Sequence, residues 1–178
     1  MNALAKKLGR RLMQGKAMLV TAESCTGGWA AQVVTSVAGS SDWFERGYVT
    51  YSNEAKRELL GVPQATLKKY GAVSEQTARE MARGALRRSR GTIALAITGV
   101  AGPAGGTKAR PVGTVCFAWA RGRRVVSETG HFSGNRERVR RHKDEKNEDQ
   151  TPRATPPSNI AVRRIRLGHQ RAEGIVDL

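Results

Sequence analysis

The sequence predicts a single three-layer α/β/α domain built on a mixed β-sheet. Amphipathic helical patterns alternate with short apolar strands through residues 1–141, an order typical of a sheet that carries helices on both faces. Residues 93–97 are apolar throughout, which predicts a central strand buried on both sides. Residues 112–119 and 124–132 flank a turn at Arg121-Gly122, so we expect them to pair as an antiparallel hairpin.

The first part of the chain is expected to run helix, strand, helix, strand. Leucines at helical spacing, with Met13 on the same face, predict the first helix, and an apolar strand follows at residues 17–22. The helix after Gly28 stops at Gly39, a residue type that commonly ends helices. Alternating side chains at residues 46–52 predict the next strand.

Two further helices are expected before the central strand. Asn53 is suited to cap the first of them, which ends at Gly61. Ser74 is suited to open the second, whose buried side includes Met81. The other side of this helix is rich in arginine, which is typical of a solvent-exposed surface.

The segment Thr-Ala-Glu-Ser-Cys-Thr-Gly-Gly at residues 21–28 lies between a predicted strand and a predicted helix. Free backbone N–H groups and the positive end of a helix dipole gather at such a turn, so it suits an anion or a developing negative charge. Ser24 and Cys25 can act as nucleophiles, and the carboxylate of Glu23 is beside them. A simpler interpretation is that Ser24 or Thr26 caps the helix and the glycines form the turn.

The net charge of +16 indicates attraction to anions. Residues 1–141 alone contain 24 Lys and Arg against 9 Asp and Glu. Nucleic acid is one candidate partner, but nine aromatic residues in the chain argue against a platform for stacked bases. A basic surface also suits a small phosphorylated substrate. We therefore expect no specific nucleic-acid binding.

Other features exclude several classes of protein. Two cysteines and three scattered histidines give neither a disulfide framework nor a zinc-ligand cluster, so no metal is expected. No apolar run approaches the roughly 20 residues of a membrane span, and the N-terminus lacks the apolar core of a signal peptide. The glycine-rich loop at residues 98–106 matches neither the Walker pattern nor the dinucleotide fingerprint. A cytoplasmic protein without membrane contact is expected.

Residues 21–28 resemble the signature of the CinA C-terminal domain family, the nicotinamide-nucleotide amidohydrolases. Four further stretches agree in the same order, at residues 38–44, 47–56, 71–74 and 98–103 with 111–115. The resemblance implies a hydrolase that needs no cofactor. It would deamidate nicotinamide mononucleotide to nicotinate mononucleotide and ammonia in pyridine nucleotide salvage.

The resemblance also implies a catalytic set of Ser24, Tyr51 and Lys56. Opening a carboxamide requires a nucleophile, a base and donors for the oxyanion. Ser24 would be the nucleophile and Lys56 the base, with a pKa lowered by burial or by nearby cations. Tyr51 would relay the proton or orient the lysine. Cys25 is the alternative nucleophile and Glu23 a weaker alternative base; without the resemblance, Tyr51 would be a core residue and Lys56 a solvated one.

A second group of residues is expected to bind the substrate. Its members lie in the two glycine-rich loops, on the adjoining strand and in the segment after the hairpin: Thr26, Gly27, Gly28, Gly99, Gly102, Thr114 and Arg136. Arg136 would clamp the phosphate, because the family pattern Gly-Asp-Arg is present here as Gly134-Asn135-Arg136. The change from Asp to Asn at position 135 removes a possible orienting carboxylate.

The chain departs from the family after residue 141. The family continues with an amphipathic helix, whereas residues 142–150 are nearly all polar and residues 151–158 include three prolines. We therefore expect a domain at residues 1–141 and a largely disordered polar tail at residues 142–178. The sheet surface left without its closing helix would be covered by another subunit, so a homo-oligomer is expected.

A different function remains open. Relatives of this family also occur as C-terminal halves of longer proteins linked to competence or DNA damage. The alternative is therefore a non-catalytic protein that binds nucleic acid through its basic surface.

Overall fold

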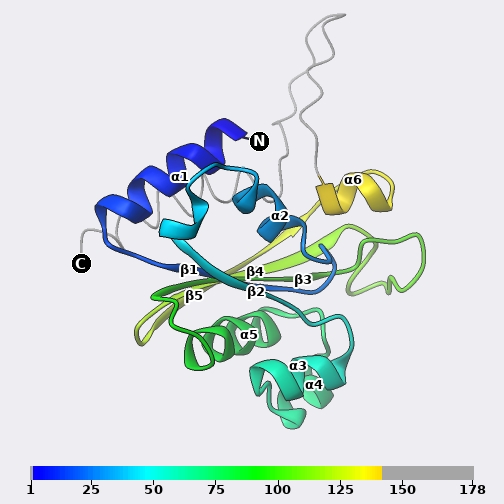
Figure 1. Ribbon diagram of the computed structural model, residues 1–178. Coiled ribbons are helices and arrows are strands. Elements are labelled where there is room, and N and C mark those ends of the chain that lie inside the picture. Colours follow the sequence, from blue (N-terminus) through cyan, green and yellow to red (C-terminus); the bar gives the residue numbers. More distant parts are fainter. Residues whose placement is uncertain (1, 142–178) are drawn as a thin grey trace, which may run out of the picture.

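The computed structural model describes residues 2–141 and has a five-stranded mixed sheet with helices on both faces (Figure 1). The strands lie in the order β2-β1-β3-β4-β5. β1 is parallel to β2 and β3, whereas β4 is antiparallel to both of its neighbours. Their bounds are Leu19–Glu23 for β1, Phe44–Val49 for β2, Ile93–Gly99 for β3, Thr114–Arg121 for β4 and Arg124–His131 for β5. The predicted three-layer α/β fold with a mixed sheet is confirmed.

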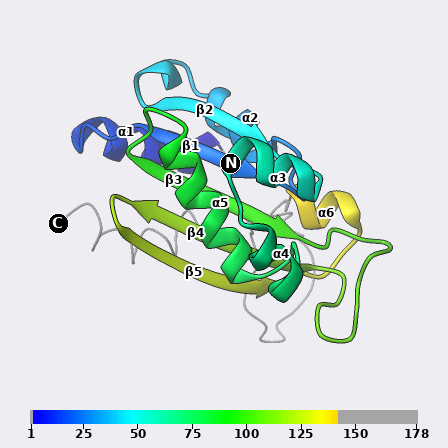
Figure 2. The same cartoon turned by 90° about the horizontal axis from the view of Figure 1, so that it is seen from below.

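The helices form the two outer layers (Figures 1 and 2). On one face of the sheet lie α1 (Asn2–Gln14), α2 (Trp29–Thr35) and the short α6 (Arg136–Arg141). On the other face, α5 (Glu75–Arg87) packs across β3, β4 and β5, with α3 (Asn53–Leu60) and α4 (Gln64–Tyr70) beside it. A short 3-10 helix, η1 (Ser40–Asp42), precedes β2.

The alternation of side chains along β3 fills both cores. Leu95 and Ile97 belong to the apolar cluster under α1 and α2, whereas Ala94 and Ala96 belong to the cluster under α5. Successive side chains of a strand point to opposite faces, so an uninterrupted apolar run serves two cores at once. This is the central strand that the sequence predicts.

Several element boundaries differ from the predictions. The predicted strand at residues 46–52 begins and ends earlier in the structure, because the chain leaves the sheet at Thr50 and turns into α3. The hairpin turn is one residue later than predicted, at Gly122-Arg123. The helix α4 was not predicted, since only Leu67 of its residues is buried and no apolar stripe marks it.

One side chain and one cap also differ. Met13 is 45% exposed and does not share the buried face of α1, whereas Leu12 is buried as predicted and Ala5 packs beside it in the same apolar cluster. Ser52 rather than Asn53 caps α3: its Oγ accepts a hydrogen bond from the N–H of Ala55 at 2.9 Å. The capping chemistry is as predicted, one residue earlier.

The tail and the division of the chain at residue 141 lie outside the described residues. Within residues 2–141, no helix is both long enough and apolar enough to cross a membrane.

Candidate active site

The site centres on a contact between Ser24 and Lys56. The Nζ atom of Lys56 lies 3.0 Å from the Oγ atom of Ser24. Ser24 follows β1 directly, and Lys56 lies in the second turn of α3. Both are buried, with 7% of Ser24 and 1% of Lys56 exposed. Lys56 is therefore not the solvated helix residue that its neighbours in the sequence suggest.

The backbone around Lys56 holds its amino group in place. The N–H of Thr50 donates to the carbonyl of Glu23 at 2.7 Å. This bond keeps the segment after β2 beside the end of β1. The Nζ atom of Lys56 donates to the carbonyl of Thr50 at 2.8 Å, and it lies 3.4 Å from the carbonyl oxygens of Tyr51 and Ser52. The amine thus meets carbonyl oxygens on one side and the serine hydroxyl on another.

Burial tunes the lysine toward base chemistry. Desolvation lowers the pKa of Lys56 to about 8, against smaller opposing influences of Cys25 and Glu54. About a tenth of the amine is then neutral at pH 7, far more than for an ordinary lysine. A neutral amine that faces Ser24 can accept the proton of its hydroxyl.

The environment of Cys25 disfavours it as a nucleophile. Burial raises the pKa of the Cys25 thiol to about 12, with the charge of Glu23 adding to the effect. The thiol is therefore protonated at neutral pH, whereas the thiolate is the reactive form. The position of Cys25 before α2 therefore does not make it a better nucleophile than Ser24.

Glu23 has a role that the sequence did not reveal. Its fully buried carboxylate accepts hydrogen bonds from the Thr26 hydroxyl at 2.7 Å, from the N–H of Ala30 at 2.9 Å and from the N–H of Ala31 at 2.8 Å. Glu23 thus caps α2 from within β1, and neither Ser24 nor Thr26 does. Three hydrogen bonds already fill most of the roughly four acceptor sites of this carboxylate, so it is poorly placed to act as a base.

The turn of residues 24–28, called the serine turn below, presents backbone donors beside Ser24. Within residues 2–141, the N–H groups of Cys25, Thr26 and Gly28 have no hydrogen-bond acceptor. Gly27 and Gly28 have φ values of 61° and 95°, a left-handed conformation that favours glycine. Because Glu23 occupies the N–H groups of Ala30 and Ala31, the open backbone donors at this corner belong to the serine turn and not to the first turn of α2.

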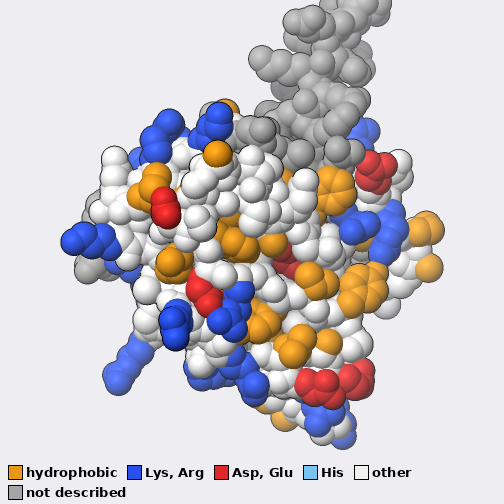
Figure 3. Space-filling model, in the orientation of Figure 1, with side chains coloured by type: hydrophobic (Ala, Val, Ile, Leu, Met, Phe, Trp, Pro, Cys, Tyr) orange, Lys and Arg blue, Asp and Glu red, His pale blue; other side chains and the backbone are white. Residues whose placement is uncertain are grey.

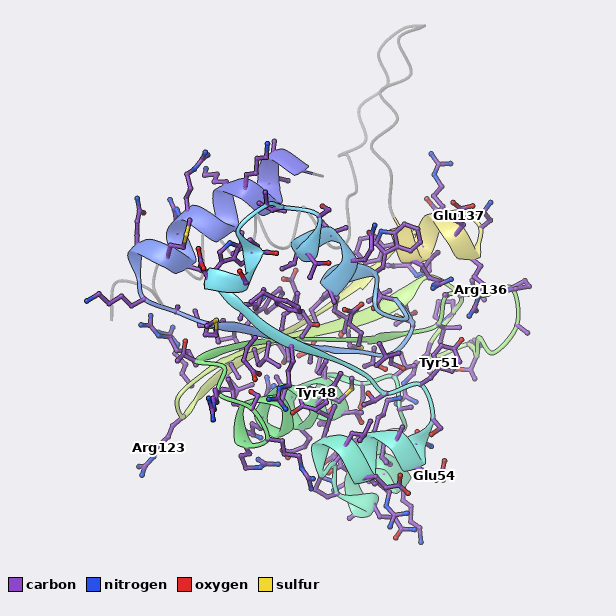
Figure 4. The ribbon with its side chains drawn as sticks, in the orientation of Figure 1. Tyr48, Tyr51, Glu54, Arg123, Arg136 and Glu137 are labelled. Carbon is purple, nitrogen blue, oxygen red and sulfur yellow. The ribbon has the colours of Figure 1, made fainter. Side chains whose placement is uncertain are left out.

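The side chain of Tyr51 extends toward Arg136 of α6 (Figure 4). Its side chain is 61% exposed, and its hydroxyl accepts a hydrogen bond from Nη2 of Arg136 at 2.5 Å. Nη1 of the same guanidinium donates to the carbonyl of Gly102 at 2.8 Å. Tyr51 is therefore not a core residue. Only its backbone carbonyl approaches the amine of Lys56.

The second glycine loop has mostly structural contacts. At Gly99 an added Cβ would lie 2.6 Å from the carbonyl oxygen of Thr114, so the close approach of β3 and β4 requires glycine there. The hydroxyl of Thr114 donates to the carbonyl of Pro111 at 2.7 Å. Among the described residues, Gly102 is the one predicted substrate-binding residue of this loop and its adjoining strand that is hydrogen-bonded to another predicted site residue, Arg136.

Asn135 serves as the cap of α6. Its Oδ1 accepts a hydrogen bond from the N–H of Arg138 at 2.9 Å. Asn and Asp are about equally good at such a position. The change from the family's Asp therefore keeps a cap on the helix that carries Arg136. A further arginine on this helix, Arg140, donates to the carbonyl of Thr26 at 3.2 Å and was not singled out from the sequence.

The sequence model of the CinA C-terminal domain matches residues 1–146. The chain belongs to the CinA C-terminal domain family. Nicotinamide-nucleotide amidohydrolase PncC of Escherichia coli (strain K12) is 52% identical over 139 residues, which are 78% of this chain and 84% of that protein. The protein of the same name from Pseudomonas putida is 53% identical over 138 residues, or 78% of this chain and 86% of that protein.

Solved structures of the family agree with the fold. The competence/damage inducible protein CihA from Agrobacterium tumefaciens superposes with a TM-score of 0.75 at 45% sequence identity, covering 78% of this chain and 86% of that one. The resemblance drawn from the motifs is thereby confirmed. Within residues 2–141, this CinA-family domain has no group of three or more His, Cys, Asp and Glu side chains that could hold a metal ion.

Proposed function

We infer that this protein is a nicotinamide-nucleotide amidohydrolase, which converts nicotinamide mononucleotide to nicotinate mononucleotide and ammonia. The observation that carries the proposal is the buried contact between Ser24 and Lys56 at 3.0 Å. It unites a hydroxyl nucleophile with an amine of lowered pKa in a domain about half identical to relatives named for this activity.

The proposed reaction starts with Lys56 in its neutral form. Ser24 Oγ attacks the carboxamide carbon while its proton passes to Lys56 Nζ. The oxyanion of the tetrahedral intermediate receives hydrogen bonds from free N–H groups of the serine turn, of which those of Cys25 and Thr26 are nearest in the chain. Lys56 then protonates the amide nitrogen, the C–N bond breaks, and ammonia leaves an acyl-serine.

Water completes the cycle. Lys56, neutral again, takes a proton from water as the water oxygen attacks the ester carbon. The C–O bond to Ser24 then breaks and the proton returns to the serine oxygen. The acid product loses its remaining proton to solvent, where ammonia takes up one proton, and it departs as the carboxylate. No histidine is needed for either half of the reaction.

Arg136 is the proposed phosphate ligand. Its guanidinium lies between the Tyr51 hydroxyl and the Gly102 carbonyl, at the edge of the site where a phosphate can exchange with these neutral partners. Tyr51 then positions Arg136 and the substrate and does not relay protons in this arrangement. Arg136→Ala is expected to raise KM more than it lowers kcat.

Ammonia release from nicotinamide mononucleotide tests the function. Purified full-length protein is expected to release one ammonia per nucleotide consumed, and Ser24→Ala is expected to release none. Circular dichroism of both proteins separates inactivity from misfolding. A folded wild-type protein that leaves the nucleotide intact would rule the proposal out.

The basic surface favours a second, weaker candidate, a non-catalytic nucleic-acid-binding protein. Lys and Arg side chains are spread over several parts of the face in Figure 3 and are not gathered into one stripe. We therefore propose sequence-blind binding that weakens steeply with salt as counterions are released. A titration of duplex DNA at two salt concentrations checks this: tight, sequence-selective binding at the higher one would favour the alternative.

Self-association and a cytoplasmic location also stay predictions. Light scattering coupled to gel filtration of the full chain measures the first, with a dimer or larger assembly expected.

A further inference from the structure

We propose that Arg140 is a positioning residue, which holds the serine turn in its productive shape from the helix α6. Nothing in the sequence motifs distinguishes it from the other arginines around it. The inference rests on the proposed function, because the N–H groups that Arg140 would hold in place are the proposed oxyanion donors beside Ser24.

Arg140 lies directly on the serine turn. Its Nη2 donates to the carbonyl of Thr26 at 3.2 Å, and a Cβ added to Gly27 would lie 2.9 Å from the same nitrogen. No carboxylate within residues 2–141 forms an ion pair with it, and its buried Nε has no acceptor there. The guanidinium is thus committed to the turn and not to a surface ion pair.

The serine turn needs such a hold. It includes two consecutive glycines, Gly27 and Gly28, which have more conformational freedom than other residues. The N–H of Gly27 donates to the carbonyl of Ser24 at 3.0 Å and the N–H of Trp29 to the carbonyl of Thr26 at 3.3 Å, whereas three N–H groups of the turn have no acceptor within residues 2–141. The directions of these three donors therefore depend on how firmly the turn as a whole is held. Glu23 fixes the start of α2 by accepting from the N–H of Ala30. Arg140 restrains the turn itself by donating to the carbonyl of Thr26.

The helix α6 is itself firmly placed. Val139, beside Arg140, is 1% exposed and belongs to the apolar core, and Asn135 caps the first turn. One turn before Arg140, Arg136 bonds to Tyr51 and Gly102. Docking of α6 therefore joins three separate segments of the site through two guanidinium groups four residues apart.

The test compares Arg140→Ala with Arg138→Ala in the full-length protein. Arg138 lies on the same helix and is exposed, so the chemical change is matched. Amide exchange followed by NMR is expected to quicken at Gly27 and Trp29 by about tenfold or more in Arg140→Ala, and not in Arg138→Ala. In ammonia-release assays of the same two variants, kcat is expected to fall about 10–100-fold for Arg140→Ala with KM nearly unchanged.

The outcomes separate this role from others. Unchanged exchange with reduced kcat means that Arg140 acts on the substrate directly, and a raised KM alone means that it only binds substrate; either result overturns the proposal. Faster exchange with full kcat overturns it too. If wild type releases no ammonia, the proposed function fails, but the exchange comparison still decides whether Arg140 holds the turn.

Arg140→Lys covers the case in which the alanine variant does not fold. It keeps the charge and one donor group, and it is expected to recover part of the amide protection and part of kcat together. Recovery of kcat without recovery of protection would show that charge and not the hold on Thr26 matters, which overturns the proposal.

Discussion

The Nζ atom of Lys56 lies 3.0 Å from the Oγ atom of Ser24, although the two residues are 32 positions apart in the sequence. The pairing of β1 with β2 ends at Glu23 and Val49, so the segments that follow these two strands leave the sheet at the same end. Ser24 is the first residue beyond one strand, and α3 begins shortly after the other. Sheet register and one capped helix thus bring the two side chains together.

The first prediction concerns pH. The neutral amine of Lys56 is the form that can accept a proton, and its pKa is about 8. We expect kcat/KM to rise about tenfold per pH unit well below 8 and to level off above it. The hydrolysis rate of nicotinamide mononucleotide from pH 6 to 9.5 measures this. A profile that is flat or falls between pH 7 and 9 would contradict Lys56 as the base.

The second prediction concerns the stability effect of the buried lysine. The pKa of Lys56 is about 8 in the folded protein against 10.5 for an unperturbed lysine. Between these values the unfolded chain binds more protons, so folding stability rises with pH. Relative to Lys56→Met, wild type is expected to gain on the order of 3 kcal/mol from pH 8 to 10.5.

Urea unfolding at several pH values measures this difference. At pH 7, Lys56→Met is expected to be at least as stable as wild type while its activity falls about 10²–10⁴-fold. The matched control is Lys68→Met, in which an exposed lysine of α4 is replaced. A Lys56→Met protein that loses stability relative to wild type at pH 7 would contradict the costly burial of the charged amine.

The third prediction separates the two candidate nucleophiles. The pKa of Cys25 is raised to about 12 by burial, so its thiol is unreactive at neutral pH. Cys25→Ala is expected to keep most of the ammonia release, and Ser24→Ala to lose it. Alkylation of the wild-type protein with iodoacetamide at pH 7 is expected to be slow at this position. Loss of activity in Cys25→Ala with retention in Ser24→Ala would reverse the assignment.

The fold was largely predictable because its strongest signals are local. The unbroken apolar run of β3, the glycine that ends α3 and the two segments around the hairpin turn all predicted elements that are present. The exact ends of β2 were not predictable, because this strand lies at the edge of the sheet and only one neighbour fixes its register. Small shifts there do not change the hydrophobic pattern.

The site was only partly predictable, since its important contacts join distant segments. Composition favours an exposed Lys56 in a polar helix, and only the family resemblance marked it as a base. Glu23 is a carboxylate inside an apolar strand, and its partners lie seven and eight residues further along the chain. Arg140 is one arginine in a basic run. No local pattern shows which of these side chains points at the serine turn.

The fourth prediction concerns Glu23 and the support of the serine turn. In Glu23→Gln, one side-chain oxygen becomes an amide group that cannot accept, while the N–H groups of Ala30 and Ala31 both still require an acceptor. In either orientation of the new amide, at least one of these buried donors loses its partner. The free energy of unfolding is expected to fall by about 1–3 kcal/mol.

The loss should extend to catalysis. The Thr26 hydroxyl also bonds to Glu23, so a displaced residue 23 shifts the backbone donors beside Ser24, and kcat is expected to fall with little change in KM. The matched control is Glu58→Gln, an exposed carboxylate of α3 whose replacement is expected to change stability by less than about 0.5 kcal/mol. Urea unfolding and ammonia release are measured on both. If Glu23→Gln behaves like Glu58→Gln, the carboxylate does not support α2 and the serine turn in the way its hydrogen bonds indicate.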